Sequence, residues 1–470
     1  MNVLLLSLLL LAAPRAGTAR GPSDAEAAFY IPKLEDVALA GPFLDIAGEK
    51  SGLLRREGWR DDVHPLLRVD VTRKDSLQEA GLDPLGAATL SLKGDQSISC
   101  VTLSDAKKYE AACGERLKTL GVPWRRDVDG VAVVGAKDSL GRVLAGYVLK
   151  GKESCAIGGG GRTIEKALLE LGKLLGKAPT GAMWKTAQAL PGQVVVVSQY
   201  AVVGLKAAGL TMTTEFKSSG RPPAVKLAGA GSSPYAGAAP DALLWSRLRI
   251  EPSQVALVLA QVSGLLGRLC PACDRAALTD TATALAPALT GNALVVVQQV
   301  KVKGTLRTFS GRFFAAQMAV LAEAADPKAA REALENLARV TGAKALESGE
   351  GFSLLLREGE VKLGVRGAHV YLSNDGAVLE AALRAVPGAA GKQAHGVELG
   401  VDPERLARAL SQVPLADVLA VPELAALLAA SAEGGPLLLA SEKLTGYADT
   451  DVAAAVRGQL VWTLKKPVAP

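Results

Sequence analysis

The chain has 470 residues, with 53 Lys and Arg against 47 Asp and Glu, and 49% of its residues are hydrophobic. This length is too great for one core of ordinary size and predicts two domains. The apolar content argues against a largely disordered chain. The basic residues are dispersed in short pairs such as Arg55-Arg56 and Arg125-Arg126, which are typical of solvated faces, so we expect no nucleic-acid partner.

The first residues have the pattern of a secretory signal. An apolar run covers 3–13, Pro14 ends it, and Gly17-Thr18-Ala19 offers small residues for cleavage. The run is well short of the roughly 20 residues that span a bilayer. The sequence therefore predicts a signal peptide over 1–19, export to the periplasm or beyond, and no transmembrane anchor after cleavage.

The predicted elements of the first half alternate between strands and helices. LLRVDVT (66–72) alternates apolar and polar residues, which predicts a half-buried strand. Asp and Gly at the ends of 105–121 predict an N-cap and a C′ residue around a helix. Residues 155–168 predict a strand end, a turn and a helix. A pair of strands is predicted at 191–200 and 210–217.

The second half repeats these patterns in the same order. The corresponding segments are strands at 244–252 and 396–403, a helix at 326–342, a strand–turn–helix at 370–383, and paired strands at 290–300 with 313–323 and at 434–443 with 458–466. The segment 370–383 aligns without gaps with 155–168. Chance similarity between Ala- and Leu-rich segments is the alternative, but the ordered recurrence of several elements favours duplication.

These recurrences predict an α+β protein of two tandem, internally duplicated lobes, each an antiparallel sheet with helices packed on one face. Lobe one covers 29–217 and lobe two covers 241–466. Residues 218–240 are rich in Gly, Pro, Ser and Ala, which predicts a linker between the lobes.

Two turns carry a resemblance to known proteins. AGLDPLG (80–86) and GVDPERL (400–406) place Asp-Pro beside predicted elements. Together with the signal peptide and the tandem halves, they resemble a group of exported bacterial proteins that carry a domain of unknown function. The resemblance is one of pattern and extends over most of the chain. It implies two α+β halves and no catalytic residue, because none is established for the group.

The five cysteines belong to two sets. Cys270 and Cys273 form a CxxC between the predicted helices 253–269 and 275–289. A redox pair is one interpretation, but the βαβ context is missing and the spacing offers no further zinc ligands. In an oxidising compartment we expect a structural disulfide that fixes the turn between the helices.

The other three cysteines, Cys100, Cys113 and Cys155, align with Leu321, Leu334 and Val370 of lobe two. This predicts apolar, core-facing positions. Two of the three can form a disulfide, but the sequence does not say which two.

Other candidate sites have simpler explanations. Gly158 to Gly161 resembles a phosphate-binding loop, but the aligned turn, 373–376, is Ser-Asn-Asp-Gly, an ordinary turn and N-cap. The three histidines His64, His369 and His395 have no metal-ligand spacing. We therefore predict no catalytic, cofactor or metal site.

The sequence leaves three functions open. The preferred hypothesis is an exported, non-enzymatic binding or structural protein with an unidentified protein partner or ligand. The second is a periplasmic carrier of a lipid or other apolar ligand, because sheets covered by Ala- and Leu-rich helices can enclose an apolar pocket. The third is a thiol–disulfide redox protein that uses Cys270 and Cys273.

Overall fold

The fold is described from a computed structural model, which divides the chain into two compact units. We call them the N-terminal unit, within Thr18–Gly220, and the C-terminal unit, within Arg221–Trp462. The structure describes residues 27–50, 64–93, 96–159, 164–175, 182–197, 201–218, 225–235, 242–270, 273–300, 316–346, 348–356, 359–384, 386, 390–412, 435–450 and 455–466. The predicted signal peptide lies outside these residues.

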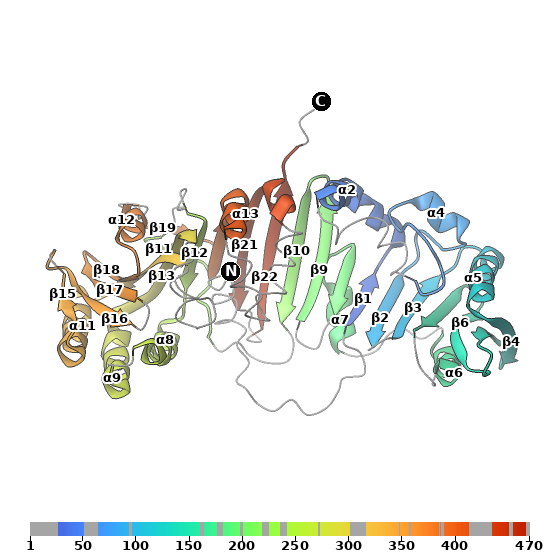
Figure 1. The fold of residues 1–470 in the computed structure, drawn as a ribbon, viewed down its shortest axis with the longest axis horizontal. Coiled ribbons are helices and arrows are strands. Elements are labelled where there is room, and N and C mark those ends of the chain that lie inside the picture. The colour runs from blue at the N-terminus through green and yellow to red at the C-terminus, as the bar shows by residue number, and fades with distance from the viewer. Residues whose placement is uncertain are drawn as a thin grey trace. The chain divides into compact units, whose positions relative to one another are not determined.

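The N-terminal unit is an antiparallel sheet with helices (Figure 1). Its strands have the order β4-β5-β6-β7-β3-β2-β1-β8-β9-β10. In chain order the elements are β1 (Ala27–Ile31), η1 (Leu34–Ala40), α2 (Gly41–Lys50), α4 (Lys74–Glu79), β2 (Ala88–Lys93), β3 (Gln96–Thr102), α5 (Ala106–Leu120), β4 (Val122–Val128), β5 (Val131–Lys137), β6 (Val143–Lys150), β7 (Glu153–Gly158), α6 (Ile164–Leu174), α7 (Ala182–Ala189), β8 (Val194–Val197), β9 (Ala201–Ala208) and β10 (Thr211–Ser218).

The C-terminal unit also contains an antiparallel sheet. Its strands have the order β15-β16-β17-β18-β14-β13-β12-β20-β21, and β22 follows β21. The elements are β11 (Gly231–Ser233), β12 (Leu244–Arg249), η3 (Pro252–Gln254), α8 (Val255–Leu269), α9 (Arg275–Leu285), η4 (Ala286–Ala288), β13 (Leu289–Val300), β14 (Ala316–Ala324), α11 (Pro327–Thr341), β15 (Lys344–Ala345), β16 (Gly351–Leu356), β17 (Gly359–Arg366), β18 (His369–Ser373), α12 (Gly376–Arg384), β19 (Gly391–Gln393), β20 (Val397–Val401), α13 (Pro403–Ser411), β21 (Ser441–Thr450) and β22 (Val456–Leu464). The α+β class and the antiparallel pairing are as predicted.

The two longest capped helices begin and end where the sequence predicts. The Asp105 carboxylate accepts the N–H groups of the first turn of α5, and Asp326 does the same for α11. Gly342 ends α11 in the left-handed conformation at φ 64°, which a glycine adopts without steric cost. Local capping chemistry therefore fixes these boundaries.

Helices cover both faces of the sheet, so the prediction of helices on one face was wrong. In the N-terminal unit, Cys113 on α5 packs in one cluster with Ala156 of β7. Leu168 on α6 packs in another cluster with Ile157, the next residue of the same strand. Successive residues of a strand point to opposite faces. The physical reason is that β7 is apolar on both faces, with Ser154 to Gly158 all buried.

The sheet of the C-terminal unit is also covered by helices on both faces. The position of Val370 in this unit bears on its alignment with Cys155. Val370 packs against the cluster of α11, whereas Tyr371 lies in the cluster of α12. Cys155 lies under α6, and Ser154 faces α5 through a hydrogen bond to Tyr109. The ungapped alignment therefore matches Cys155, which packs with the helix that follows its strand, with Val370, which does not pack in the cluster of the helix that follows its strand. A shift of one residue changes the face to which a strand residue points.

Three strand predictions also differ from the structure. Residues 435–439, within the strand expected at 434–443, are helical, and β21 begins only at Ser441. Residues 66–72 form no strand, and Asp70 and Thr72, expected on the wet face, are buried together with the apolar residues. The Asp70 carboxylate accepts hydrogen bonds from the Thr72 N–H and hydroxyl, so a local turn satisfies these polar groups instead of a ladder. The strands expected to pair at 191–200 and 210–217 are separated by β9, which pairs with both β8 and β10.

Part of the expected linker is folded onto the C-terminal unit. Within 218–240 the structure describes 225–235, where β11 pairs with β19 and Tyr235 is buried. Leu227 forms a bridge to Ile250, and the Ala228 N–H donates to the Arg249 carbonyl. This segment therefore has ladder-like hydrogen bonds in spite of its Gly, Pro and Ser content.

Two disulfides are present among the described residues. Cys100 of β3 and Cys155 of β7 are opposite each other in the ladder, with 4.0 Å between their Cα atoms. This resolves the pairing that the sequence left open and leaves Cys113 as a buried free thiol. Cys270 and Cys273 form the second disulfide, between the end of α8 and the start of α9.

We expect the two disulfides to contribute unequally to stability. The Cys100–Cys155 bond spans 55 residues and the Cys270–Cys273 bond spans 3. Loop-closure entropy then predicts losses of about 4 and about 1.5 kcal/mol in the free energy of unfolding when each pair is replaced by Ser. Urea unfolding of the two double variants measures both losses. A larger loss for the 270–273 pair would contradict the ranking.

Candidate functional site

A cleft in the C-terminal unit lies where strand ends meet two helices. Its volume is about 630 Å³, within the range of small-molecule sites. The end of β13, the start of β14, the first turn of α12 and one side of α13 line it. Three of its apolar lining residues are buried, and we call them the apolar floor: Leu243, Val378 and Ala409.

The turn before α12 is held to β14 by the Asn374 side chain, which makes two hydrogen bonds to the β14 backbone as a neighbouring strand would. The Asn374 Oδ1 accepts the Met318 N–H at 2.9 Å, and its Nδ2 donates to the Ala316 carbonyl at 2.7 Å. Asp375 then caps α12, because its Oδ1 accepts the N–H groups of Ala377 and Val378. As predicted, Ser-Asn-Asp-Gly is a turn and N-cap. It also forms one wall of the cleft.

Amide side chains supply much of the polar lining. Gln317 Nε2 donates to the Asp375 Oδ2 at 2.6 Å. Gln299 is opposite Gln317 in the ladder, and Gln298 lines the cleft beside them. Each amide has both donor and acceptor groups. This wall therefore offers hydrogen bonds of both kinds.

The opposite wall is helix α13, which begins beside the start of β12. The Asp402 N–H donates to the Leu243 carbonyl at 2.9 Å, and its Oδ1 caps the helix through the Arg405 N–H at 3.0 Å. Arg405 and Arg408 line the cleft from this helix. Arg405 pairs with Asp402, and Arg408 pairs with Glu404 on the same helix.

The described lining residues carry groups that can bind a polar molecule. Among the described lining residues there is no His, Cys or Ser, and Asp375 is the one acid. Its carboxylate is already engaged on both oxygens. The chemistry available is hydrogen bonding by amides and charge from the two guanidinium groups.

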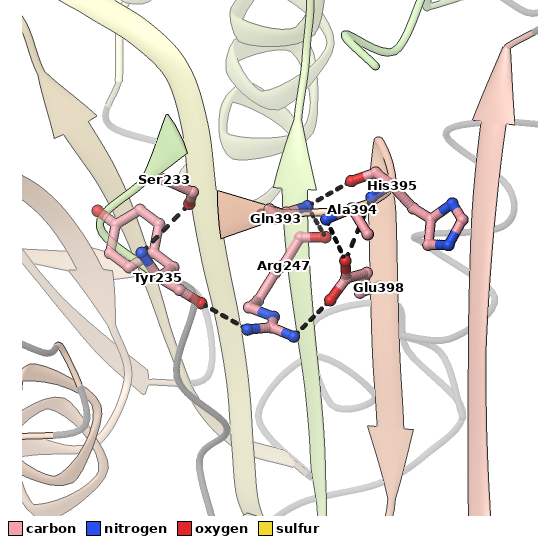
Figure 2. A network of polar contacts seen from close by, with 7 residues as sticks. All are labelled: Ser233, Tyr235, Arg247, Gln393, Ala394, His395 and Glu398. Atoms are coloured by element: carbon pink, nitrogen blue, oxygen red, sulfur yellow. Dashed lines mark hydrogen bonds and ion pairs between the residues drawn. The ribbon is translucent and has the colours of Figure 1, made fainter. Parts of the chain in front are cut away.

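A second group of polar side chains lies at the opposite end of β12. Figure 2 shows Arg247 between the Tyr235 carbonyl and the Glu398 carboxylate. Only 11% of the Arg247 side chain and 16% of the Glu398 side chain are exposed, so this ion pair is largely desolvated. The other Glu398 oxygen accepts the N–H groups of Ala394 and His395. The pair therefore fixes both the segment before β20 and the segment at Tyr235.

Aromatic contacts complete this polar network. The Arg247 guanidinium lies 4.9 Å from the centroid of the Trp245 ring. A Cβ atom at Gly400 would lie 2.6 Å from the same indole, so the glycine of the GVDP motif makes room for Trp245. The motif that carried the family resemblance thus has a packing role here.

His395 and Asp449 form a pair that sequence analysis did not predict. The His395 Nδ1 lies 2.7 Å from Asp449 Oδ2, and the other carboxylate oxygen accepts the Gly396 N–H. Tyr447 stacks on the imidazole at 3.7 Å between centroids. We interpret this arrangement as a structural contact that fixes the turn before β20, because Asp449 binds both the His395 side chain and the Gly396 backbone.

Removing half of the Arg247–Glu398 pair should be costly. Glu398→Gln keeps the side-chain shape but leaves the buried guanidinium without a countercharge, so we expect a loss of about 3 kcal/mol in the free energy of unfolding. The matched control is Glu404→Gln, whose pair with Arg408 is exposed and should cost under about 1 kcal/mol. Equal losses in urea unfolding would contradict the claim that the largely buried Arg247–Glu398 pair costs more to break than an exposed pair.

The other residues singled out by sequence lie outside the cleft. Cys270 and Cys273 are 2% and 8% exposed, so both sulfur atoms are shielded. Residues 160–163 of the glycine-rich turn lie outside the described residues. His369 accepts or donates a hydrogen bond with the Tyr235 hydroxyl at 2.9 Å. Burial lowers the pKa of His369, and the nearby Glu323 opposes this shift.

His64 is a core residue of the N-terminal unit. Its Nδ1 accepts the N–H groups of Leu66 and Leu67, so the ring proton is on Nε2, which lies 3.2 Å from the Tyr109 hydroxyl. The Tyr109 hydroxyl also contacts Ser154 Oγ at 2.9 Å. Burial lowers the pKa of His64 to about 3. The imidazole is therefore neutral and structural.

This burial predicts a pH-dependent stability. The pKa of His64 is about 3 in the folded chain and about 6.5 when unfolded, so the unfolded state binds more protons between these values. Stability should fall as the pH drops through this window, by about 2 kcal/mol between pH 7 and 5 from this residue alone. His64→Asn keeps an acceptor near the position of Nδ1 and should flatten this slope in urea unfolding. An unchanged slope would contradict the assignment.

Comparison with known proteins identifies no relative. No family model, no curated protein and no solved structure matches the chain. Within the described residues, no cluster of three or more His, Cys, Asp or Glu is placed to hold a metal ion. A search of the same residues finds no helix with the length and apolar character needed to cross a membrane.

Proposed function

We propose that this is an exported, non-enzymatic binding protein, and that the cleft between α12 and α13 holds a small polar ligand. The observation that carries the proposal is the lining itself. It combines an apolar floor with amide and guanidinium groups, the arrangement by which small-molecule sites orient a ligand. A partner protein remains the alternative kind of occupant.

We also propose that the two units are duplicated copies, as the sequence predicts. Their strand orders support this. When β15 is matched to β4 and the matching continues along each sheet, every strand of the larger C-terminal sheet has a counterpart at the same place in the N-terminal order. The exceptions are β11 and β19, which form a separate two-stranded sheet. Helix α11 follows β14 as α5 follows β3, and α12 follows β18 as α6 follows β7.

Export remains a proposal from the predicted signal peptide. The two disulfides are consistent with an oxidising compartment, where such bonds persist. The resemblance to exported bacterial proteins with a domain of unknown function is also a proposal, because it depends on turn motifs and on the tandem halves. These features support a ligand outside the cytoplasm.

The observations support the two alternative functions less well. An apolar carrier needs an apolar pocket, whereas the cleft has a polar rim, and an apolar cavity beside His64 has a volume of only about 10 Å³. A redox protein needs an accessible thiolate, whereas Cys270 and Cys273 are buried.

A bulky residue in the cleft should abolish binding. Ala377 is exposed in the first turn of α12 and lines the cleft. We expect Ala377→Trp to remove the saturation-transfer NMR signals that a set of small acids, amides, sugars and alcohols gives with the mature chain. Ala276→Trp is the matched control, because Ala276 is also exposed and also lies two residues after a capping Asp, on α9.

The two variants separate a specific site from general adhesion. Signals that survive in Ala377→Trp, or that disappear equally in Ala276→Trp, would contradict a binding role for the cleft. Failure of the whole set to bind to the unaltered chain would also contradict it. The melting temperature of each variant shows whether the chain is folded during the measurement.

A further inference from the structure

We propose that the ligand of this cleft is a small carboxylic acid, with its carboxylate held by Arg408 and Arg405 of α13. This inference rests on the proposed function and adds the chemical class of the ligand. It follows from how the charges of the lining are arranged and from which of them are already engaged.

The two guanidinium groups are on the same side of one helix. Residues three apart on an α-helix are neighbours on its surface, and both Arg405 and Arg408 line the cleft. Guanidinium groups bind carboxylates through two parallel hydrogen bonds, which no neutral ligand group reproduces. An acid in the cleft therefore meets two adjacent cationic donors.

The acids that pair with these arginines are weak competitors. Asp402 caps α13 and Glu404 lies in its first turn, and the side chains of both ion pairs are more than a third exposed. Exposed pairs of this kind contribute about 0–1 kcal/mol. A ligand carboxylate over the floor of the cleft is less solvated, so its attraction to the same guanidinium groups is stronger.

The acid on the opposite wall does not repel such a ligand strongly. Both oxygens of Asp375 are occupied, one by the N–H groups of Ala377 and Val378 and the other by Gln317 Nε2. The positive end of the α12 dipole faces this carboxylate and offsets its charge. Among the lining residues that the structure describes, one side chain is negative and two are positive, and the negative one is the better neutralised.

The rest of the cleft limits the size and polarity of the acid. Leu243, Val378 and Ala409 form a small apolar floor, which suits a short carbon chain. Gln298 and Gln317 on the sheet side provide hydrogen bonds to a second polar group. A short hydroxy or amido acid satisfies both, whereas a long alkyl chain would meet the polar rim.

The experiment compares each acid with its own amide. Short mono- and dicarboxylic acids and the matching carboxamides are titrated into the mature chain and followed by saturation-transfer NMR. We expect the acids to bind more tightly than their amides. Arg408→Gln should weaken the acids about tenfold, the effect of losing one charge-assisted interaction, and should leave the amides unchanged. Arg384→Gln, on the exposed end of α12 outside the cleft, is the control for net charge.

Each outcome supports or overturns the assignment. Equal binding of acids and amides, or equal weakening by Arg408→Gln and Arg384→Gln, would overturn the carboxylate class. If neutral amides or sugars bind and Ala377→Trp removes them, the binding function stands and only the ligand class fails. If no probe depends on Ala377, the proposed function itself fails, which distinguishes the two results.

Discussion

The ion pair between Arg247 and Glu398 sets the geometry on which the rest of the C-terminal unit depends. These residues are direct partners in the antiparallel ladder of β12 and β20. A largely desolvated charge pair is costly to break, so it opposes any shift of one strand against the other. Because a shift of one residue would move the side chains of the shifted strand to the opposite face of the sheet, the pair specifies which residues face the core.

That register also positions the cleft at the far end of the same two strands. With Arg247 opposite Glu398, Leu244 is opposite Val401, and the next residue, Asp402, is hydrogen-bonded to Leu243. Helix α13 starts there, so its arginines reach the space in front of α12. The proposed ligand site is thus a consequence of strand register and helix capping.

The sequence predicted those parts of this fold that depend on local chemistry. The helices after Asp105 and Asp326 were placed correctly because a capping carboxylate and periodic apolar residues are visible in one dimension. The strand at 66–72 was not, because the alternation there is produced by a turn around Asp70 with both sides buried. The second helix layer was missed because the sequence pattern did not distinguish strands buried on both faces, such as β7 from Ser154 to Gly158, from half-buried strands.

Most of the candidate site could not be predicted from the sequence, because its residues come together only through strand pairing. Gln317, Asp375 and Arg408 come from three elements, and only the β13–β14–β18 ladder and the β12–β20 register bring them together. The one available signal was the Asn374-Asp375 turn, which was interpreted as a cap. It is a cap, and the same carboxylate orients a glutamine of the cleft. The His395–Asp449 contact likewise joins residues 54 apart through strand pairing.

Native mass spectrometry of the mature chain, purified from the cells that make it, tests the central claim most directly. If the cleft holds a small polar ligand, the chain should carry an additional small mass that leaves on denaturation and is absent from Ala377→Trp. A bare polypeptide mass, or the same additional mass on both proteins, would contradict the assignment of this cleft as the ligand site.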